Sequence, residues 1–199
     1  PLERALALAR ASGDLQREAA ALGGLGNASV ALGDFKTAEK LLGQAIELAQ
    51  QGRGVDAATR AALSASLLNN LGNQRMIAGR GKGALSAYGE SADTARAGGQ
   101  ALLAAQAEAN AARTALELGL ADRARGSLLA ARKSLAEAER TPTQDTAARI
   151  HLAQTEATLA GEDPAQRSEA LLAAHGDLVR AGEAAEAAGD LRTASQALG

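Results

Sequence analysis

Residues 25–45 have the sequence LGNASVALGDFKTAEKLLGQA, and this stretch decides the fold. Gly33 separates two runs in which apolar residues recur at helical spacing. Ala38 and Ala45 follow this glycine by five and twelve residues, and a Leu-Gly pair precedes it. Glycine is favoured where a helix ends in a left-handed residue, and small residues let two helices approach closely. The stretch therefore predicts a helical hairpin that turns at Gly33, with Asp34 near the start of its second helix.

The same pattern returns twice further along the chain. Gly79 lies 46 residues after Gly33, and Gly119 lies another 40 residues on. The small residues at the two following offsets are Ala84 and Ser91 after Gly79, and Ala124 and Ala131 after Gly119. Gly161 is a weaker fourth anchor. Repeats of about 40–46 residues are typical of proteins built from stacked helical hairpins.

The composition favours helix throughout. Hydrophobic residues make up 46% of the chain, yet aromatic residues make up only 1%. Alanine supplies the difference, at roughly a quarter of all residues, well above its ordinary usage. Because alanine is the best helix former and a poor strand former, the sequence predicts an all-α protein.

Glycines and a Thr-Pro-Thr segment separate one predicted hairpin from the next. The predicted helices are 15–32, 35–51, 56–78, 82–97, 100–118, 121–140, 143–160 and 164–175. We expect one array over residues 1–199, with repeats at about 15–52, 56–98, 100–140 and 143–175 and a partial repeat at 177–199. Gly176-Asp177 is a break in one interpretation, whereas in the other a single long helix runs through it.

Several classes of function find no support in the residues. The net charge of −2 gives no basic excess for nucleic acid, and the chain has no cysteine. His151 and His175 are the only histidines and lie 24 residues apart, so we expect neither a metal site nor a cofactor. No set of residues indicates a nucleophile with its base, and we expect no enzyme activity.

The sequence leaves the compartment open. No apolar run approaches the roughly 20 residues of a membrane span, which indicates a soluble chain. Because the chain begins at Pro1, we expect a trimmed or processed fragment. A cytoplasmic location fits the residues, and so does a periplasmic one if a signal peptide was removed.

The repeat pattern resembles the tetratricopeptide repeat family. The resemblance depends on Leu25-Gly26 with Gly33 and Ala38, and on their counterparts around Gly79, where Tyr88 matches the family's aromatic position. Spacings above the family's usual length of about 34 residues look like the lengthened repeats of kinesin light chains and of bacterial arrays that precede a CHAT protease-like domain. The segment 68–73, LNNLGN, looks most like that branch. The resemblance implies a right-handed α-solenoid of stacked antiparallel helix hairpins.

The resemblance also implies a binding surface. In this family the first helix of each hairpin lines a concave groove that binds peptides. The corresponding partner-binding candidates are Asn27, Asn69, Asn70, Asn73, Gln106, Asn110 and Arg113. They include all five asparagines of the chain, and an amide both donates and accepts hydrogen bonds, as a peptide backbone requires.

Each of these candidates also has a structural interpretation. The asparagines could instead bond between adjacent helices, and Arg113 could pair with Glu117 one helical turn on. Asn27 and Asn70 match two positions of the family's clamp for acidic tails, but its basic positions hold Gly23, Gln106 and Asn110. We therefore exclude the acidic-tail clamp.

Three glycines fall within the first predicted helix. Gly23, Gly24 and Gly26 each cost a helix about 0.5–1 kcal/mol relative to alanine. We expect a neighbouring backbone or side chain to approach closely there, although a later helix start is the alternative.

The leading hypothesis is a protein–protein interaction scaffold that binds a peptide or protein partner in its groove. An alternative is a regulatory or sensor segment of a larger multidomain bacterial protein, controlling a catalytic domain absent from this chain. A structural spacer or oligomerisation unit is the third hypothesis. The oligomeric state stays open at this stage.

Overall fold

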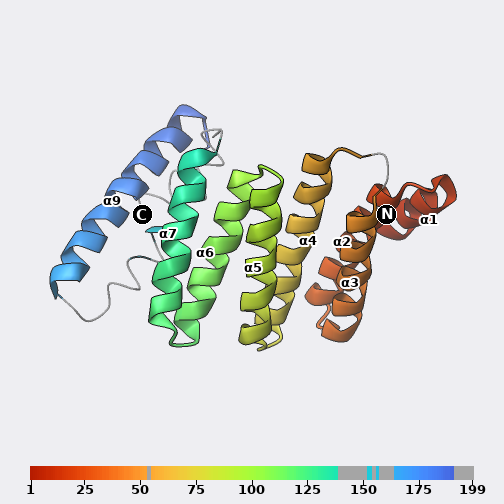
Figure 1. The fold of residues 1–199 in the computed structure, drawn as a ribbon, viewed down its shortest axis with the longest axis horizontal. Coiled ribbons are helices and arrows are strands. Elements are labelled where there is room, and N and C mark those ends of the chain that lie inside the picture. Colours follow the sequence, from red (N-terminus) through yellow and green to blue (C-terminus); the bar gives the residue numbers. More distant parts are fainter. Residues whose placement is uncertain (53–54, 139–151, 154–155, 157–163, 191–199) are drawn as a thin grey trace. The chain divides into compact units, whose positions relative to one another are not determined.

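The computed structural model describes residues 1–52, 55–138, 152–153, 156 and 164–190. Every regular element in these ranges is an α-helix, which confirms the all-α prediction. The helices are α1 (Leu2–Ser12), α2 (Leu15–Ala31), α3 (Phe35–Gln51), α4 (Ala57–Ile77), α5 (Gly81–Ala97), α6 (Ala101–Glu117), α7 (Ala121–Glu137) and α9 (Pro164–Ala187) (Figure 1).

The predicted bounds agree closely with α2 to α6, each end falling within one residue of its predicted place. Three differences remain. Helix α1 was not predicted at all, and α7 ends at Glu137 rather than at residue 140. A single helix, α9, runs through Gly176, so the continuous-helix alternative is correct and no hairpin begins at residue 177. The predicted helix 143–160 and the anchor Gly161 lie largely or wholly outside the described residues.

The anchor glycines end their helices as predicted. Gly33, Gly79 and Gly119 have φ angles of 76°, 72° and 72°, a left-handed conformation that is strained for other residues. The amide N–H of Gly33 donates to the Val30 carbonyl and that of Asp34 donates to the Ser29 carbonyl, both at 2.9 Å. These two bonds satisfy carbonyls at the end of α2 that the helix itself leaves unpaired.

Aspartates begin the helices that follow. The Asp34 carboxylate accepts from the Thr37 backbone N–H at 3.0 Å, and Asp56 accepts from that of Thr59 at 2.8 Å. In both cases the hydrogen bonds from the threonine lower the pKa of the carboxyl. Asp122 lies in the first turn of α7, where its charge meets the positive end of the helix dipole.

The chain divides into two compact units, residues 1–107 and 108–199, and the boundary falls inside α6. In the first unit α2 pairs with α3, and α4 pairs with α5. Helix α3 also contacts α4, α2 contacts α4, and α1 packs on α2 (Figure 1). The first helices of the two hairpins, α2 and α4, are therefore direct neighbours, and the predicted packing of consecutive helices in pairs is confirmed.

Small residues allow this close packing. Ala38 and Ala84 are 0% exposed, as predicted for the positions that follow the anchor glycines. A Cβ atom at Gly26 would lie 2.9 Å from Leu42 Cγ, and one at Gly72 would overlap the Tyr88 ring. Gly23 similarly leaves room for Leu67 of α4. Close packing, rather than a later helix start, therefore explains the glycines of α2.

In the second unit, α7 buries the predicted positions Ala124 and Ala131 together with Leu128 and Leu135. Helix α9 buries Ala181, against which Leu178 packs. Among the described helices of either unit, none has the length and the apolar character that a membrane crossing requires.

Candidate interaction surface

Helix α4 has a buried side and a polar side. Leu67, Leu71 and Gln74 are buried, at 3%, 8% and 0% exposure. Asn69, Asn70 and Asn73 are each partly exposed. Since residues three and four apart share one side of a helix, these three amides form a continuous polar strip along α4.

Helix α2 carries one asparagine in the equivalent position. Asn27 precedes Asn73 by 46 residues, the same interval that separates Gly33 from Gly79. The Asn27 side chain is exposed, and α2 contacts α4 directly. We call the exposed polar sides of these two helices, with Asn27, Asn69, Asn70 and Asn73, the amide face.

The hydrogen bonds of the amide face distinguish its members. The Tyr88 hydroxyl donates to Asn73 Oδ1 at 2.7 Å, linking α5 to α4. This bond uses the carbonyl oxygen of Asn73, as expected for an asparagine that bonds between adjacent helices. It does not involve the NH₂ group of Asn73. By contrast, the side chains of Asn27 and Asn70 bond to no residue in the described ranges. Within the described ranges, Asn27 and Asn70 are therefore the two members of the amide face whose side chains make no hydrogen bond.

The remaining candidates lie on α6. Gln106 is exposed and belongs to the first unit, as the amide face does. Asn110 is partly exposed and Arg113 is exposed, and both belong to the second unit. Arg113 Nη1 lies 3.8 Å from Glu117 Oε1, so the predicted pairing one turn along the helix is present. Both side chains stay about half exposed, and such surface pairs contribute little to stability.

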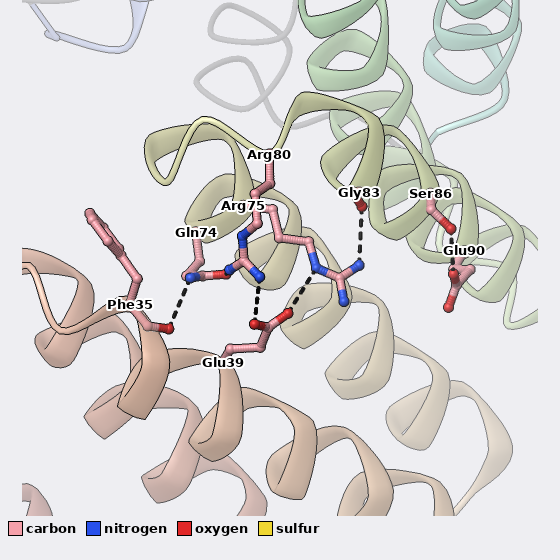
Figure 2. A network of polar contacts seen from close by, with 8 residues as sticks. All are labelled: Phe35, Glu39, Gln74, Arg75, Arg80, Gly83, Ser86 and Glu90. Atoms are coloured by element: carbon pink, nitrogen blue, oxygen red, sulfur yellow. Dashed lines mark hydrogen bonds and ion pairs between the residues drawn. The ribbon is translucent and has the colours of Figure 1, made fainter.

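A polar network beside the amide face was not predicted (Figure 2). Glu39 of α3 accepts from two arginines: Arg80 Nη1 lies 2.6 Å from one carboxylate oxygen, and Arg75 Nε lies 3.3 Å from the other. The hydrogen bond from Arg80, with the nearby positive charges, lowers the pKa of Glu39 against the opposing effect of its partial burial. Arg75 also donates to the Gly83 carbonyl at 3.1 Å.

Gln74 completes this network from inside the core. Its Nε2 donates to the Phe35 carbonyl at 3.1 Å, and its Oε1 accepts from Arg80 Nη2 at 3.1 Å (Figure 2). The network thus joins the start of α3 to α4 and to the turn that leads into α5. Its charged groups already bind one another, which suits a link between hairpins better than a ligand site.

Sequence reasoning missed this network because its partners are distant in the chain. Glu39 and Arg80 are separated by 41 residues, and Phe35 and Gln74 by 39. Helical spacing relates only residues within a turn or two, so no local pattern pairs them. The available signal was the glutamine at position 74, which falls on the otherwise apolar side of α4.

Comparisons with known proteins find likeness of fold. No protein-family model matches the chain, and no curated protein matches its sequence. The crystal structure of BtubC (BKLC) from P. vanneervenii superposes with a TM-score of 0.68 at 18% identity, covering 99% of this chain and 85% of that one. Rap protein complexed with Competence and Sporulation Factor gives a TM-score of 0.67 at 20% identity. The match to Rap covers 98% of this chain and 55% of the Rap chain.

A third solved structure carries the repeat in its name. The crystal structure of a Podosopora anserina putative kinesin light chain with nearly identical TPR-like repeats superposes with a TM-score of 0.62 at 16% identity. That match covers 90% of this chain and 84% of the other. The class of fold is therefore that of tetratricopeptide-like helical repeat proteins, as the sequence pattern indicated.

Proposed function

We propose that this chain is a protein–protein interaction scaffold, and that its amide face binds an extended peptide or an extended segment of a protein partner. The observation that carries the proposal is the pair Asn27 and Asn70, which present amides unbonded within the described ranges on neighbouring first helices.

The chemistry of the amide face suits a peptide backbone. An extended segment presents alternating N–H and C=O groups, and a side-chain amide can pair with either. Asparagine is also a mediocre helix former, so its repeated use in mid-helix calls for a compensating role. Asn73 has such a role in its bond with Tyr88, whereas binding a ligand supplies one for Asn27 and Asn70.

The amide face also offers an apolar contact. Ile77 lies one helical turn beyond Asn73 on α4 and is 63% exposed. A peptide that bonds to the amides through its backbone could place an apolar side chain there. Because the amides would contact only the peptide backbone, the preference for particular peptide sequences would be modest. It would be set mainly by the side chain that contacts Ile77.

The fold comparisons support the proposal at the level of class. A neighbour in fold, Rap, is described in complex with Competence and Sporulation Factor. Stacked helical hairpins present extended surfaces, which repeat proteins commonly use for binding.

Peptide selection followed by substitution tests the proposal. Random peptides, each about a dozen residues long and displayed on phage, are selected on the wild-type chain, and the dissociation constant of a recovered peptide is measured by fluorescence anisotropy. The variant carries Asn27→Ala with Asn70→Ala. The matched control carries Gln44→Ala with Gln51→Ala, which removes two exposed amides from α3 instead.

Each lost hydrogen bond is worth about 0.5–1.5 kcal/mol, so the asparagine variant should bind roughly tenfold more weakly. Its thermal midpoint should be no lower than that of the wild type, because neither asparagine bonds within the described fold and alanine is the better helix former. The glutamine control should bind normally. Equal binding by the asparagine variant, or recovery of no peptide, would reject the proposal.

A further inference from the structure

A small pocket lies between the first half of α4 and the second half of α5. Its volume is about 360 Å³, within the range of about 300–1,000 Å³ that small-molecule sites span. Arg60 and Ser64 of α4 line it, with Thr94 of α5 and Gln50 near the end of α3. The other lining residues are three alanines and Gly98, and the whole pocket belongs to the first unit.

Close contacts between α4 and α5 bound this pocket. A Cβ atom at Gly98 would overlap the Cβ of Ala61, so the two helices approach closely where α5 ends. Further along, the Ser91 hydroxyl donates to the Ala65 carbonyl at 2.7 Å. Between these two contacts the facing side chains are short, and they leave the space that forms the pocket.

The polar groups that line the pocket have unmet hydrogen-bonding capacity. Ser64 is 2% exposed, and its buried Oγ has no hydrogen-bond partner in the described part of the chain. Within the same ranges the Thr94 side chain makes no hydrogen bond, and Arg60 makes no ion pair. Arg60 Nη1 donates to the Gly52 carbonyl at 3.2 Å. Because buried polar groups in proteins are nearly always bonded, this set indicates a ligand that supplies acceptors.

The charge of the pocket favours an anion. A guanidinium group only donates hydrogen bonds, and its strongest bonds are to anionic oxygens. Among the described residues, none that lines the pocket is acidic. Asp56 lies one turn before Arg60, but Thr59 binds both of its carboxylate oxygens, at 2.8 Å and 2.6 Å. The positive charge of Arg60 is therefore available to a ligand.

The number of donors distinguishes a carboxylate from a phosphate. Phosphate sites commonly combine several backbone N–H groups at a helix N-terminus. Here one guanidinium and two hydroxyls converge, which suits the two oxygens of a carboxylate. The alanine side chains supply an apolar wall for the rest of the ligand.

We propose that this pocket binds a small organic carboxylate. Arg60 and the hydroxyls of Ser64 and Thr94 bind its head group, and its apolar body packs on the alanines. The pocket shares no residue with the amide face, so the failure of either proposal leaves the other standing.

Titration with hexanoate tests this site in ¹⁵N-labelled protein at constant ionic strength. The dissociation constant is measured from the backbone N–H signals of Ser64 and Thr94. Hexan-1-ol, which lacks the charge, and inorganic phosphate, which lacks the apolar body, are titrated in parallel. The variants are Arg60→Gln and Ser64→Ala. Their matched controls are Arg4→Gln, at an exposed position of α1, and Ser66→Ala, on α4 but outside the pocket.

Hexanoate should shift both signals saturably and bind at least about tenfold more tightly than hexan-1-ol, since its bonds to Arg60 are charge-assisted. Arg60→Gln should weaken binding about tenfold and Ser64→Ala about three- to tenfold, whereas both controls should bind as the wild type does. Without ligand, Ser64→Ala should raise the thermal midpoint more than Ser66→Ala does, because it also removes a buried hydroxyl that has no partner.

Three results would overturn the proposal. The first is the absence of saturable shifts with hexanoate. The second is equal binding of phosphate, which would mean that the site selects charge alone. The third is an unchanged dissociation constant for hexanoate in Arg60→Gln and Ser64→Ala, which would place the ligand elsewhere on the chain.

Discussion

Gly72 and Tyr88 show how one hydrogen atom in place of a side chain sets the distance between two helices. Tyr88 is 0% exposed, and its ring occupies the space where a Cβ of residue 72 would be. The hydroxyl is bonded to Asn73, so the ring cannot move aside without losing that bond. The Leu-Gly pairs before Gly33 and Gly79 were therefore reliable signals of close packing.

We predict that Gly72→Ala lowers the free energy of unfolding by about 1–3 kcal/mol, because the methyl group overpacks the contact with Tyr88. Gly43→Ala is the matched control within α3, since no atom lies within 4 Å of the added Cβ. There alanine should raise stability by roughly 0.5–1 kcal/mol through its helix propensity. Chemical denaturation of both variants measures these free energies of unfolding. A Gly72→Ala protein as stable as the wild type would show that the Tyr88 ring leaves room for the methyl group.

Gln74 is the residue that sequence reasoning could not interpret. Nothing local distinguishes it from a solvent-exposed glutamine, because its partners come from α3 and from the turn before α5. Only the apolar side on which it falls marks it as buried. Asn27 and Asn70 could be named as candidates because the repeat register of the family that the sequence resembles places them on the first helices of two hairpins, where Asn27 is exposed and Asn70 is partly exposed.

We predict that Gln74→Ala costs about 1–3 kcal/mol, because it removes a fully buried side chain together with its hydrogen bonds to the Phe35 carbonyl and to Arg80. Gln44→Ala, at an exposed position of α3, should change the free energy of unfolding by no more than about 0.5 kcal/mol. Thermal and chemical denaturation compare the two. Equal costs for both substitutions would mean that water replaces the Gln74 amide without loss.

At the scale of the helix, the capping residues were the dependable signals. Gly33 and Asp34 set the end of α2 and the start of α3 within one residue of prediction. Helix α1 was missed although Gly13 and Asp14 form the same pair, with Gly13 at φ 67°. Gly33 and Gly79 each follow a Leu-Gly pair, whereas no such pair precedes Gly13. The apolar residues Leu2, Leu6 and Ala9 recur at helical spacing before Gly13, and this was the signal that would have found α1.

The contacts of Glu39 in α3 with Arg75 of α4 and with Arg80, in the turn before α5, should make stability depend on pH. The pKa of Glu39 is lowered from its ordinary value of 4.5, mainly by Arg80. A carboxyl with a lowered pKa in the folded state stabilises the fold above its unfolded pKa, and this contribution disappears as pH falls through the folded value. We therefore predict that the free energy of unfolding declines below about pH 4.5 in urea titrations of the wild type.

The variant Glu39→Gln isolates the contribution of this network. At pH 7 it should be less stable than the wild type by about 0.5–1 kcal/mol, since the carboxylate is partly exposed. The difference between the two proteins should shrink as the pH falls toward 3, because the wild-type carboxyl then becomes neutral as well. If the difference in free energy of unfolding were the same at pH 7 and pH 3, the ionisation of Glu39 would not contribute to the pH dependence of stability.

At the scale of the whole molecule, the fold class was predictable and the hydrogen-bond partners were not. Alanine content, the glycine anchors and the repeat period together specified helical hairpins packed in consecutive pairs, and these features are local or periodic. Whether an amide such as Asn73 bonds to a neighbouring helix or makes no hydrogen bond within the protein depends on tertiary contacts. Within the described ranges, Asn73 accepts a hydrogen bond from Tyr88, whereas the side chains of Asn27 and Asn70 make none.

The most direct test of the proposed function observes the amides themselves. In ¹⁵N-labelled protein the side-chain NH₂ groups of Asn27 and Asn70 give their own NMR signals, as do those of Gln44 and Gln51 on α3. On titration with a peptide recovered by selection, we predict that the Asn27 and Asn70 signals shift the most among the side-chain amides, while the two glutamine signals stay in place. Stationary asparagine signals at saturating peptide, or larger shifts at Gln44 and Gln51, would contradict binding at the amide face.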